Sequence, residues 1–134
     1  MNCRSRVFIG VMALLLGATP GQADTHYVWR NNPSAPVPPF TGGWASAATN
    51  IQDALDWAVS NDVVLVASGV YNTGGRSNWP AGSALTNRVA ISNAVTVRAV
   101  SANPADTLIV GAPDPGTGSN GPSAVRCVYL AANS

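Results

Sequence analysis

The stretch TNIQDALDWAVSNDVVLVASGVY, residues 49–71, decides the fold of this chain. Its first half places apolar residues along one stripe at helical spacing, namely Ile51, Ala54, Leu55, Ala58 and Val59. Thr49 followed three residues later by Gln52 is a capping-box pattern, which satisfies free backbone N–H groups at the start of a helix. The sequence therefore predicts an amphipathic helix at about residues 50–60, with Ile51, Leu55 and Val59 buried.

The second half of the stretch predicts a strand that ends in a sharp turn. VVLVA, residues 63–67, is a continuous run of apolar and mostly β-branched residues, which is typical of a strand covered on both faces in a parallel sheet. Gly69 allows a tight turn directly after the strand, and Tyr71 closes the unit. We therefore expect a helix that leads almost directly into a parallel strand.

Similar runs predict five more short strands. They are residues 24–29, 87–91, 94–100, 107–110 and 125–130. Residues 30–43 contain several prolines and are expected to form an extended surface segment. Polar or Gly- and Pro-rich turns separate the last four strands, and no helical pattern lies between them. Ordinary parallel sheets need long crossovers whereas a coiled solenoid does not, so the pattern favours a parallel solenoid.

Residues 49–111 resemble the N-terminal part of right-handed parallel β-helix proteins, the pectin-lyase-like superfamily. The motifs that carry the resemblance are 51–58 (IQDALDWA), 69–71 (GVY), 95–97 (VTV) and 107–111 (TLIVG). The chain departs from the family pattern at residues 61–62, where Asn-Asp replaces Gly-Asp, and at 98–99, where a glycine is common. The resemblance implies an all-β fold: a right-handed parallel β-helix, or solenoid, with only its first few coils present. Its N-terminal capping helix, at about residues 50–60, would cover the open end of the first coil.

The start of the chain has the three parts of a secretory signal peptide in the right order. Residues 1–23 begin with two arginines, continue with an apolar run, and end with small residues before a cleavage point between Ala23 and Asp24. The apolar run is shorter than the ~20 residues that cross a bilayer. We therefore expect export to a secreted or cell-surface location, cleavage after Ala23, and no transmembrane span in the mature chain. We also expect residues 24–134 to form the N-terminal portion of a longer β-helix domain.

Charge and cysteine content exclude several partners. Every basic residue is Arg and every acidic residue is Asp, and after loss of residues 1–23 five arginines and six aspartates remain. Nucleic acids and anionic membranes are bound by clustered basic residues, so neither is an expected partner. Cys3 leaves with the signal peptide, so Cys127 has no partner within the mature chain and no disulfide framework is expected.

The sequence assigns no catalytic, cofactor-binding or metal-binding residue, and no cofactor is expected. Asp53 and Asp56 lie off the apolar stripe of the predicted helix and are expected to be solvated. The other candidate acids, Asp62, Asp106 and Asp114, lie beside turn-forming residues, where Asp bonds nearby backbone. Polysaccharide lyases of the superfamily use acidic residues for calcium and an Arg or Lys base on later coils. No residues of this chain match that set.

The arginines in predicted strands, the cysteine and the histidine of the mature chain are not expected to take part in catalysis or ligand binding. Arg98 and Arg126 lie in predicted strands and are expected to point outward into solvent. Period-two alternation beside Arg126 then turns Cys127 toward the core, where a thiol is buried and unreactive. His26 has no acid near it in the sequence and is expected to be exposed.

Three tryptophans leave a binding function open. Trp29, Trp44 and Trp79 lie in or beside predicted loops. Such residues form stacking platforms for sugar rings in some proteins and fill gaps between loops and the strand stack in others. Trp57 lies on the polar side of the helix and is expected to pack beneath the Pro-rich segment 30–43.

Two functions from different classes remain. The first is a secreted or cell-surface β-helix protein of structural, adhesive or glycan-contacting type, with no catalytic site in this chain and with polysaccharide or other surface components as partners. The alternative is the N-terminal fragment of a polysaccharide lyase or glycoside hydrolase whose catalytic coils lie beyond residue 134. A small β-sandwich binding module is a weaker third option, because it requires antiparallel strands and the run at residues 63–67 favours parallel pairing.

The end of the sequence leads to two further expectations. After the predicted strand 125–130, residues 131–134 are too few to cover the apolar cross-section of a coil. We therefore expect the natural product to continue past Ser134. We also expect residues 24–134 alone to self-associate through the open C-terminal coil, because uncovered strand edges pair with other chains.

Overall fold

A computed structural model describes residues 21–132 of the chain. Its strands are β1 Thr25–Val28, β2 Val63–Val66, β3 Gly69–Tyr71, β4 Thr86–Ile91, β5 Thr96–Ala99, β6 Thr107–Ile109 and β7 Val125–Leu130. Its helices are short: α1 Ile51–Leu55 and the 3-10 turns η1 Trp44–Ser46 and η2 Pro104–Asp106. The charged and apolar parts of the predicted signal peptide lie in residues 1–20, outside the described residues, so the signal peptide stays a prediction.

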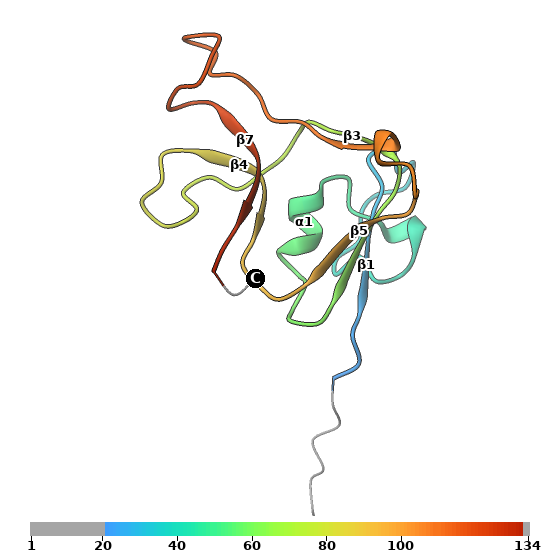
Figure 1. The fold of residues 1–134 in the computed structure, drawn as a ribbon. Coiled ribbons are helices and arrows are strands. Elements are labelled where there is room, and N and C mark those ends of the chain that lie inside the picture. Colours follow the sequence, from blue (N-terminus) through green and yellow to red (C-terminus); the bar gives the residue numbers. More distant parts are fainter. Residues whose placement is uncertain (1–20, 133–134) are drawn as a thin grey trace, which may run out of the picture.

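The described strands form three small sheets, and every pair of strands within them is parallel. The sheet orders are β1-β2-β5, β3-β6 and β4-β7. Along the chain, β2, β3 and β4 belong to the three sheets in turn, and β5, β6 and β7 join the same sheets in the same order. Figure 1 shows the three sheets arranged around α1. The predicted strand positions, the parallel pairing and a mostly-β chain with few helices are therefore confirmed.

The first sheet is buried on one face and half-open on the other. In β1, His26 and Val28 are buried while Thr25 and Tyr27 are partly exposed, and β2 repeats this alternation. Register pairs bring Val28 beside Val66 and Tyr27 beside Leu65, so each row of side chains shares one face. The prediction that residues 63–67 are covered on both faces is therefore wrong, because the apolar run leaves Leu65 on a half-exposed surface.

Helix α1 is shorter than predicted. Ile51 and Leu55 are buried as expected, but the helix ends at Leu55 and Val59 is 63 % exposed. The physical reason is a local side-chain contact, since the Asp62 carboxylate accepts the backbone N–H of Val59, three residues earlier, at 2.8 Å and turns the chain away from the helix axis. Asn61 completes the turn in the left-handed region at φ 78°.

The predicted capping box is also wrong, and its glutamine has a different role. Asn50 occupies the N-cap position, and no side chain makes a capping hydrogen bond there. The Gln52 side chain reaches β4 instead: its Oε1 accepts the Ala90 N–H at 2.7 Å and its Nε2 donates to the Ala90 carbonyl at 3.4 Å. The Gln52 amide thus contacts both the backbone N–H and the carbonyl of Ala90, the two groups that would otherwise pair with a neighbouring strand. Helix α1 also packs against β1 and β2, and its contact with an open strand edge is the one that Gln52 makes with β4.

Strand β7 presents the opposite face from the one predicted. Val128 pairs with Val89, which belongs to the buried cluster, so the core-side residues of β7 are those in phase with Val128 and not with Cys127. Cys127 is exposed, and the prediction that it is buried is wrong. Even the core-side Val128 and Leu130 are 45 % and 64 % exposed, since no described strand pairs with the far side of β7 beyond the bridge from Ala112 to Val125.

Candidate functional site

An aromatic groove lies on the described surface. Its volume is about 490 Å³, and it is lined by Trp29, Trp44, Ala67, Ser68 and Val100. The five lining residues include no carboxylate, imidazole or thiol. The groove can therefore stack a flat apolar ligand face, with the Ser68 hydroxyl as its polar side-chain group.

The floor and one wall of the groove come from the ends of three neighbouring strands. Ala67 donates its N–H to the carbonyl of Val28, and Val100 donates to that of Val66, each at 2.8 Å. These bonds extend the β1-β2-β5 register by one step, which places Ala67 and Val100 in the same row as Trp29. Trp29 itself donates its N–H to Ala48 at 2.8 Å. The floor is therefore made by regular backbone pairing.

The floor is also supported from below by a tyrosine. Tyr71 is buried at the end of β3, and its hydroxyl donates to the carbonyl of Ala67 at 2.8 Å. Burial raises the pKa of Tyr71, although its contacts with Arg30 partly oppose the shift. The neutral phenol therefore remains a hydrogen-bond donor and holds the turn after β2 in place.

The second wall is Trp44, which is carried by the loop between β1 and α1. Its ring meets Tyr27 in a T-shaped contact, with centroids 4.9 Å apart and planes at 77°. The loop is held by the Val37 N–H, which donates to Ser46 at 3.0 Å, and by the Asn32 side chain, which donates to Ala47 at 2.9 Å. Because these contacts position the ring while leaving it exposed, Trp44 is available to a ligand.

The other tryptophans do not take part in the groove. Trp79 is partly buried, and the Arg76 guanidinium lies 5.2 Å from the centre of its ring, so it fills space beside a loop. Trp57 is 55 % exposed, and the prediction that it packs beneath the Pro-rich segment is wrong. Of the three tryptophans left open by the sequence, Trp29 and Trp44 therefore come together and Trp79 does not.

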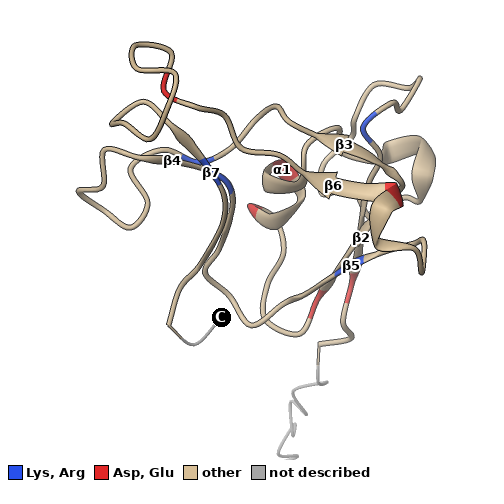
Figure 2. Ribbon diagram, turned by 45° about the horizontal axis from the view of Figure 1, so that its top comes forward, with Lys and Arg blue, Asp and Glu red and all other residues tan. Residues whose placement is uncertain are grey.

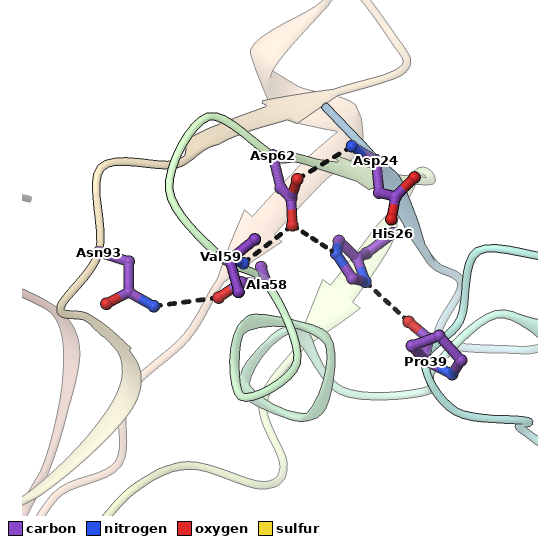
Figure 3. A network of polar contacts seen from close by, with 7 residues as sticks. All are labelled: Asp24, His26, Pro39, Ala58, Val59, Asp62 and Asn93. Carbon is purple, nitrogen blue, oxygen red and sulfur yellow. Dashed lines mark hydrogen bonds and ion pairs between the residues drawn. The ribbon is translucent and has the colours of Figure 1, made fainter. Parts of the chain in front are cut away.

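A buried histidine–aspartate pair joins the start of β1 to the residue before β2 (Figure 3). His26 Nε2 is 3.1 Å from Asp62 Oδ2, and His26 Nδ1 is 2.7 Å from the carbonyl of Pro39. Both partners are hydrogen-bond acceptors, so the tautomer of His26 decides which of them receives a ring N–H. The expectation that His26 is exposed is wrong, because 2 % of the residue is accessible.

The Asp62 carboxylate is the centre of this network. Burial alone raises the pKa of Asp62, but hydrogen bonds from the backbone N–H groups of Val59 and Asp24, and from His26, outweigh it and hold the pKa below its usual value. The prediction that Asp62 bonds nearby backbone is confirmed by Val59, and it missed the contacts with β1. A sequence signal existed: if residues 24–29 and 63–67 pair in parallel, Asp62 falls beside the start of β1.

The remaining acids have structural contacts. Asp53 and Asp56 are exposed as predicted, and Asp56 also forms an ion pair with Arg76 at 3.0 Å. Asp114 is buried, and the backbone N–H groups of Ser123 and Gly116 hold its pKa below the usual value. Its prediction as a backbone-bonding turn residue is confirmed.

Asp106 differs from the expectation for a turn aspartate. Its carboxylate accepts hydrogen bonds from the side chains of Ser101 and Asn103, at 2.6 and 3.0 Å, rather than from backbone groups. It is exposed on η2 and stabilises that turn.

Charged residues are sparse over the described surface, and the blue segments of β4 and β7 lie side by side (Figure 2). Arg88 of β4 is buried and donates to the carbonyls of Val110 and Gly74, at 3.0 and 2.6 Å, so it holds two loops together. Arg98 and Arg126 are exposed as predicted. Arg126 pairs in register with the buried Asn87 of β4.

Within residues 21–132, no cluster of three or more His, Cys, Asp or Glu side chains is arranged to hold a metal ion. The same residues include no helix with the length and apolar character needed to cross a membrane. No family model matches the chain, and comparisons with curated proteins and with solved structures find no match.

Proposed function

We propose that this chain is an exported, non-catalytic module of the parallel β-helix type that contacts glycans, and that a sugar ring stacks in the groove between Trp29 and Trp44. The aromatic groove is the observation that carries the proposal. The export rests on the signal-peptide pattern of residues 1–23, and the β-helix rests on the order of the strands.

The order of the strands supports the β-helix. A right-handed parallel β-helix places each successive strand of a coil in a different sheet, and the next coil repeats the order. The sequence of β2, β3 and β4 followed by β5, β6 and β7 over three parallel sheets has this repeat. The contact of Gln52 with the edge of β4 is consistent with a helix that covers the first coil.

The composition and size of the groove support a sugar ligand. Ligand pockets in proteins are commonly about 300–1,000 Å³ and mostly apolar, with few polar groups. The groove has that size and two indole rings on its walls. Indole faces pack well against the C–H faces of a pyranose ring, while the ring hydroxyls remain in water. The absence of acid and base groups among the five lining residues is consistent with binding without bond cleavage.

The test is a binding measurement on variants of the groove. Neutral and acidic oligosaccharides are titrated into the purified protein by calorimetry, and Trp44→Ala is compared with Trp57→Ala. Loss of about 50 Å² of stacked apolar surface costs about 1.3 kcal/mol, which is roughly tenfold in Kd. Trp57 is exposed and does not line the groove, so its variant should bind like the unchanged protein.

A second variant tests the groove without removing Trp44, whose loss could change the structure of its loop. Val100 lies on the groove floor and is 55 % exposed, so Val100→Trp should fill the groove without removing either aromatic wall. We expect it to abolish binding while the thermal midpoint stays unchanged. Equal affinities of the Trp44→Ala and Trp57→Ala proteins, or no binding of any oligosaccharide at millimolar concentration, would contradict the proposal.

A further inference from the structure

The first backbone nitrogen of the expected mature chain lies against a buried carboxylate. The N–H of Asp24 donates to Asp62 Oδ1 at 2.9 Å, as Figure 3 shows. Asp62 is 4 % exposed. The Asp24 nitrogen cannot move far from it, because the Asp24 carbonyl accepts the N–H of Val63 at 2.9 Å. The contact is therefore fixed by the pairing of β1 with β2.

The Asp62 carboxylate can pair with a further positively charged group. Its contacts within the described residues are the N–H groups of Asp24 and Val59 and the ring of His26. In the uncleaved chain, His26 is the one group in this set that can carry positive charge. The Asp24 side chain is exposed, and it is the other ionisable group at this end of β1. A buried carboxylate is stabilised strongly by a cation at hydrogen-bond distance.

The predicted cleavage point falls directly before this nitrogen. The signal-peptide pattern places the cut between Ala23 and Asp24. Residues 21–24 are exposed, and in Figure 1 the blue start of the chain leads away from the body below β1. In the folded chain, the Ala23–Asp24 peptide bond therefore lies in an exposed segment directly before the paired strand β1.

We propose that removal of the signal peptide completes the fold, because the new amino group of Asp24 forms a buried ion pair with Asp62. Hydrolysis of the Ala23–Asp24 bond by a signal peptidase consumes one water. It leaves a carboxylate on Ala23 and an amino group on Asp24, which takes up a proton at neutral pH. The hydrogen bond from the uncharged Asp24 amide to the Asp62 carboxylate then becomes an ion pair at the same position.

The consequence is that the mature chain differs from its precursor in the attachment of β1. His26 and the Asp24 ammonium would contact the two oxygens of one carboxylate, both from the first strand. Asp62 in turn holds the end of α1 through Val59. Cleavage therefore stabilises the junction between β1, the helix turn and β2, and the precursor remains less stable at this end. The inference rests on the predicted cleavage point and does not use the aromatic groove.

The test uses the absence of lysine from the chain. The amino terminus is the one primary amine of the mature protein, so an amine-reactive ester reports on it alone. The full chain is exported from a bacterial host, and mass spectrometry identifies its first residue. The matched control carries Gly-Ser inserted between Ala23 and Asp24, which keeps the Asp24 N–H but moves the charged amine two residues away.

We expect an amino terminus at Asp24 whose amine reacts with the ester about tenfold more slowly than that of the Gly-Ser protein, since one pKa unit is a tenfold change in free amine. The two rates should agree in denaturant. Asp62→Asn should remove the difference in the folded state. Equal rates in the folded proteins, or a mature chain that begins at another residue, would overturn the proposal.

A second measurement does not depend on whether the Asp62 variant folds. The ion pair raises the pKa of the amine in the folded state, so its stabilisation is present below the unfolded value of about 8 and is lost as pH rises through the folded value. The mature chain should therefore melt at a higher temperature than the Gly-Ser protein near pH 6, and the two should converge near pH 10. Identical melting at both values would contradict the ion pair.

Discussion

Replacement of Gln52 by leucine tests how the helix closes the edge of β4. Leucine keeps most of the buried volume but removes both amide contacts with Ala90, together with the hydrogen bond from Nε2 to the exposed Asp56 carboxylate at 2.6 Å. Gln52 and Ala90 are 3 % and 2 % exposed, so water cannot replace the lost partner. The substitution therefore leaves a buried backbone N–H without an acceptor.

The magnitude follows from the two distances. The Ala90 N–H to Oε1 bond is 2.7 Å and strong, whereas the Nε2 contact with the Ala90 carbonyl is 3.4 Å and weak. An unsatisfied buried N–H costs about 1–3 kcal/mol, so Gln52→Leu should lower the free energy of unfolding by about 2 kcal/mol. For a domain of this size, that corresponds to a fall of roughly 10 °C in the thermal midpoint.

The assay is denaturant unfolding together with hydrogen exchange at the Ala90 amide, which should exchange faster in the variant. Asp53→Asn is the matched control, because Asp53 is exposed on the same helix and its hydrogen bond is to the Asn50 side chain. The control should change stability by less than about 0.5 kcal/mol. A Gln52→Leu protein as stable as the control, with unchanged exchange at Ala90, would refute the closure of the β4 edge by α1.

Three more outcomes follow from the contacts. The pKa of Asp62 is lower in the folded state than in the unfolded state, so its contribution to the stability of the fold is present above about pH 4 and is lost as pH falls through the folded pKa. Acid unfolding of Asp62→Asn should therefore depend less on pH than that of the unchanged protein. An identical pH profile would contradict the network. Cys127 is exposed, so a thiol reagent should label it in the folded protein as fast as in the unfolded one, whereas strong protection would contradict its position. The uncovered β7 face should make the chain associate as its concentration rises, and Val128→Asp with Leu130→Lys should reduce the association in sedimentation velocity; a monomer at high concentration without these changes would disprove it.

Six of the seven described strands could be predicted from the sequence because each is a short apolar run between glycines, prolines and polar turns, whereas β3, Gly69–Tyr71, forms where the sequence predicts a turn. The runs at residues 63–67 and 125–130 both became strands, β2 and β7, and both pair in parallel. The alternation of side chains along a strand does not by itself show which set of residues faces the core. A period of two allows either Cys127 or Val128 to face the core, and the pairing of Val128 with Val89 decides between them.

Side-chain contacts explain the other differences. The apolar stripe extends to Val59, but the Asp62 side chain bonds the Val59 N–H three residues earlier and ends the helix, and the spacing of apolar residues does not reveal such a bond. His26 and Asp62 are 36 residues apart, so their pairing depends on the register of β1 with β2. The groove has the same origin, since the row that unites Trp29 with Val100 exists only after three strands have paired.

The central claim is that Trp29 and Trp44 bind a sugar ring. The most direct measurement follows the four indole N–H signals of the chain by NMR while an oligosaccharide that binds in the calorimetric assay is added. The signals are assigned by replacing each tryptophan with phenylalanine in turn. The account predicts that the Trp29 and Trp44 signals shift together and saturate with one dissociation constant, while those of Trp57 and Trp79 stay in place. Shifts confined to Trp57 or Trp79, or no saturable shift at Trp29 and Trp44, would contradict it.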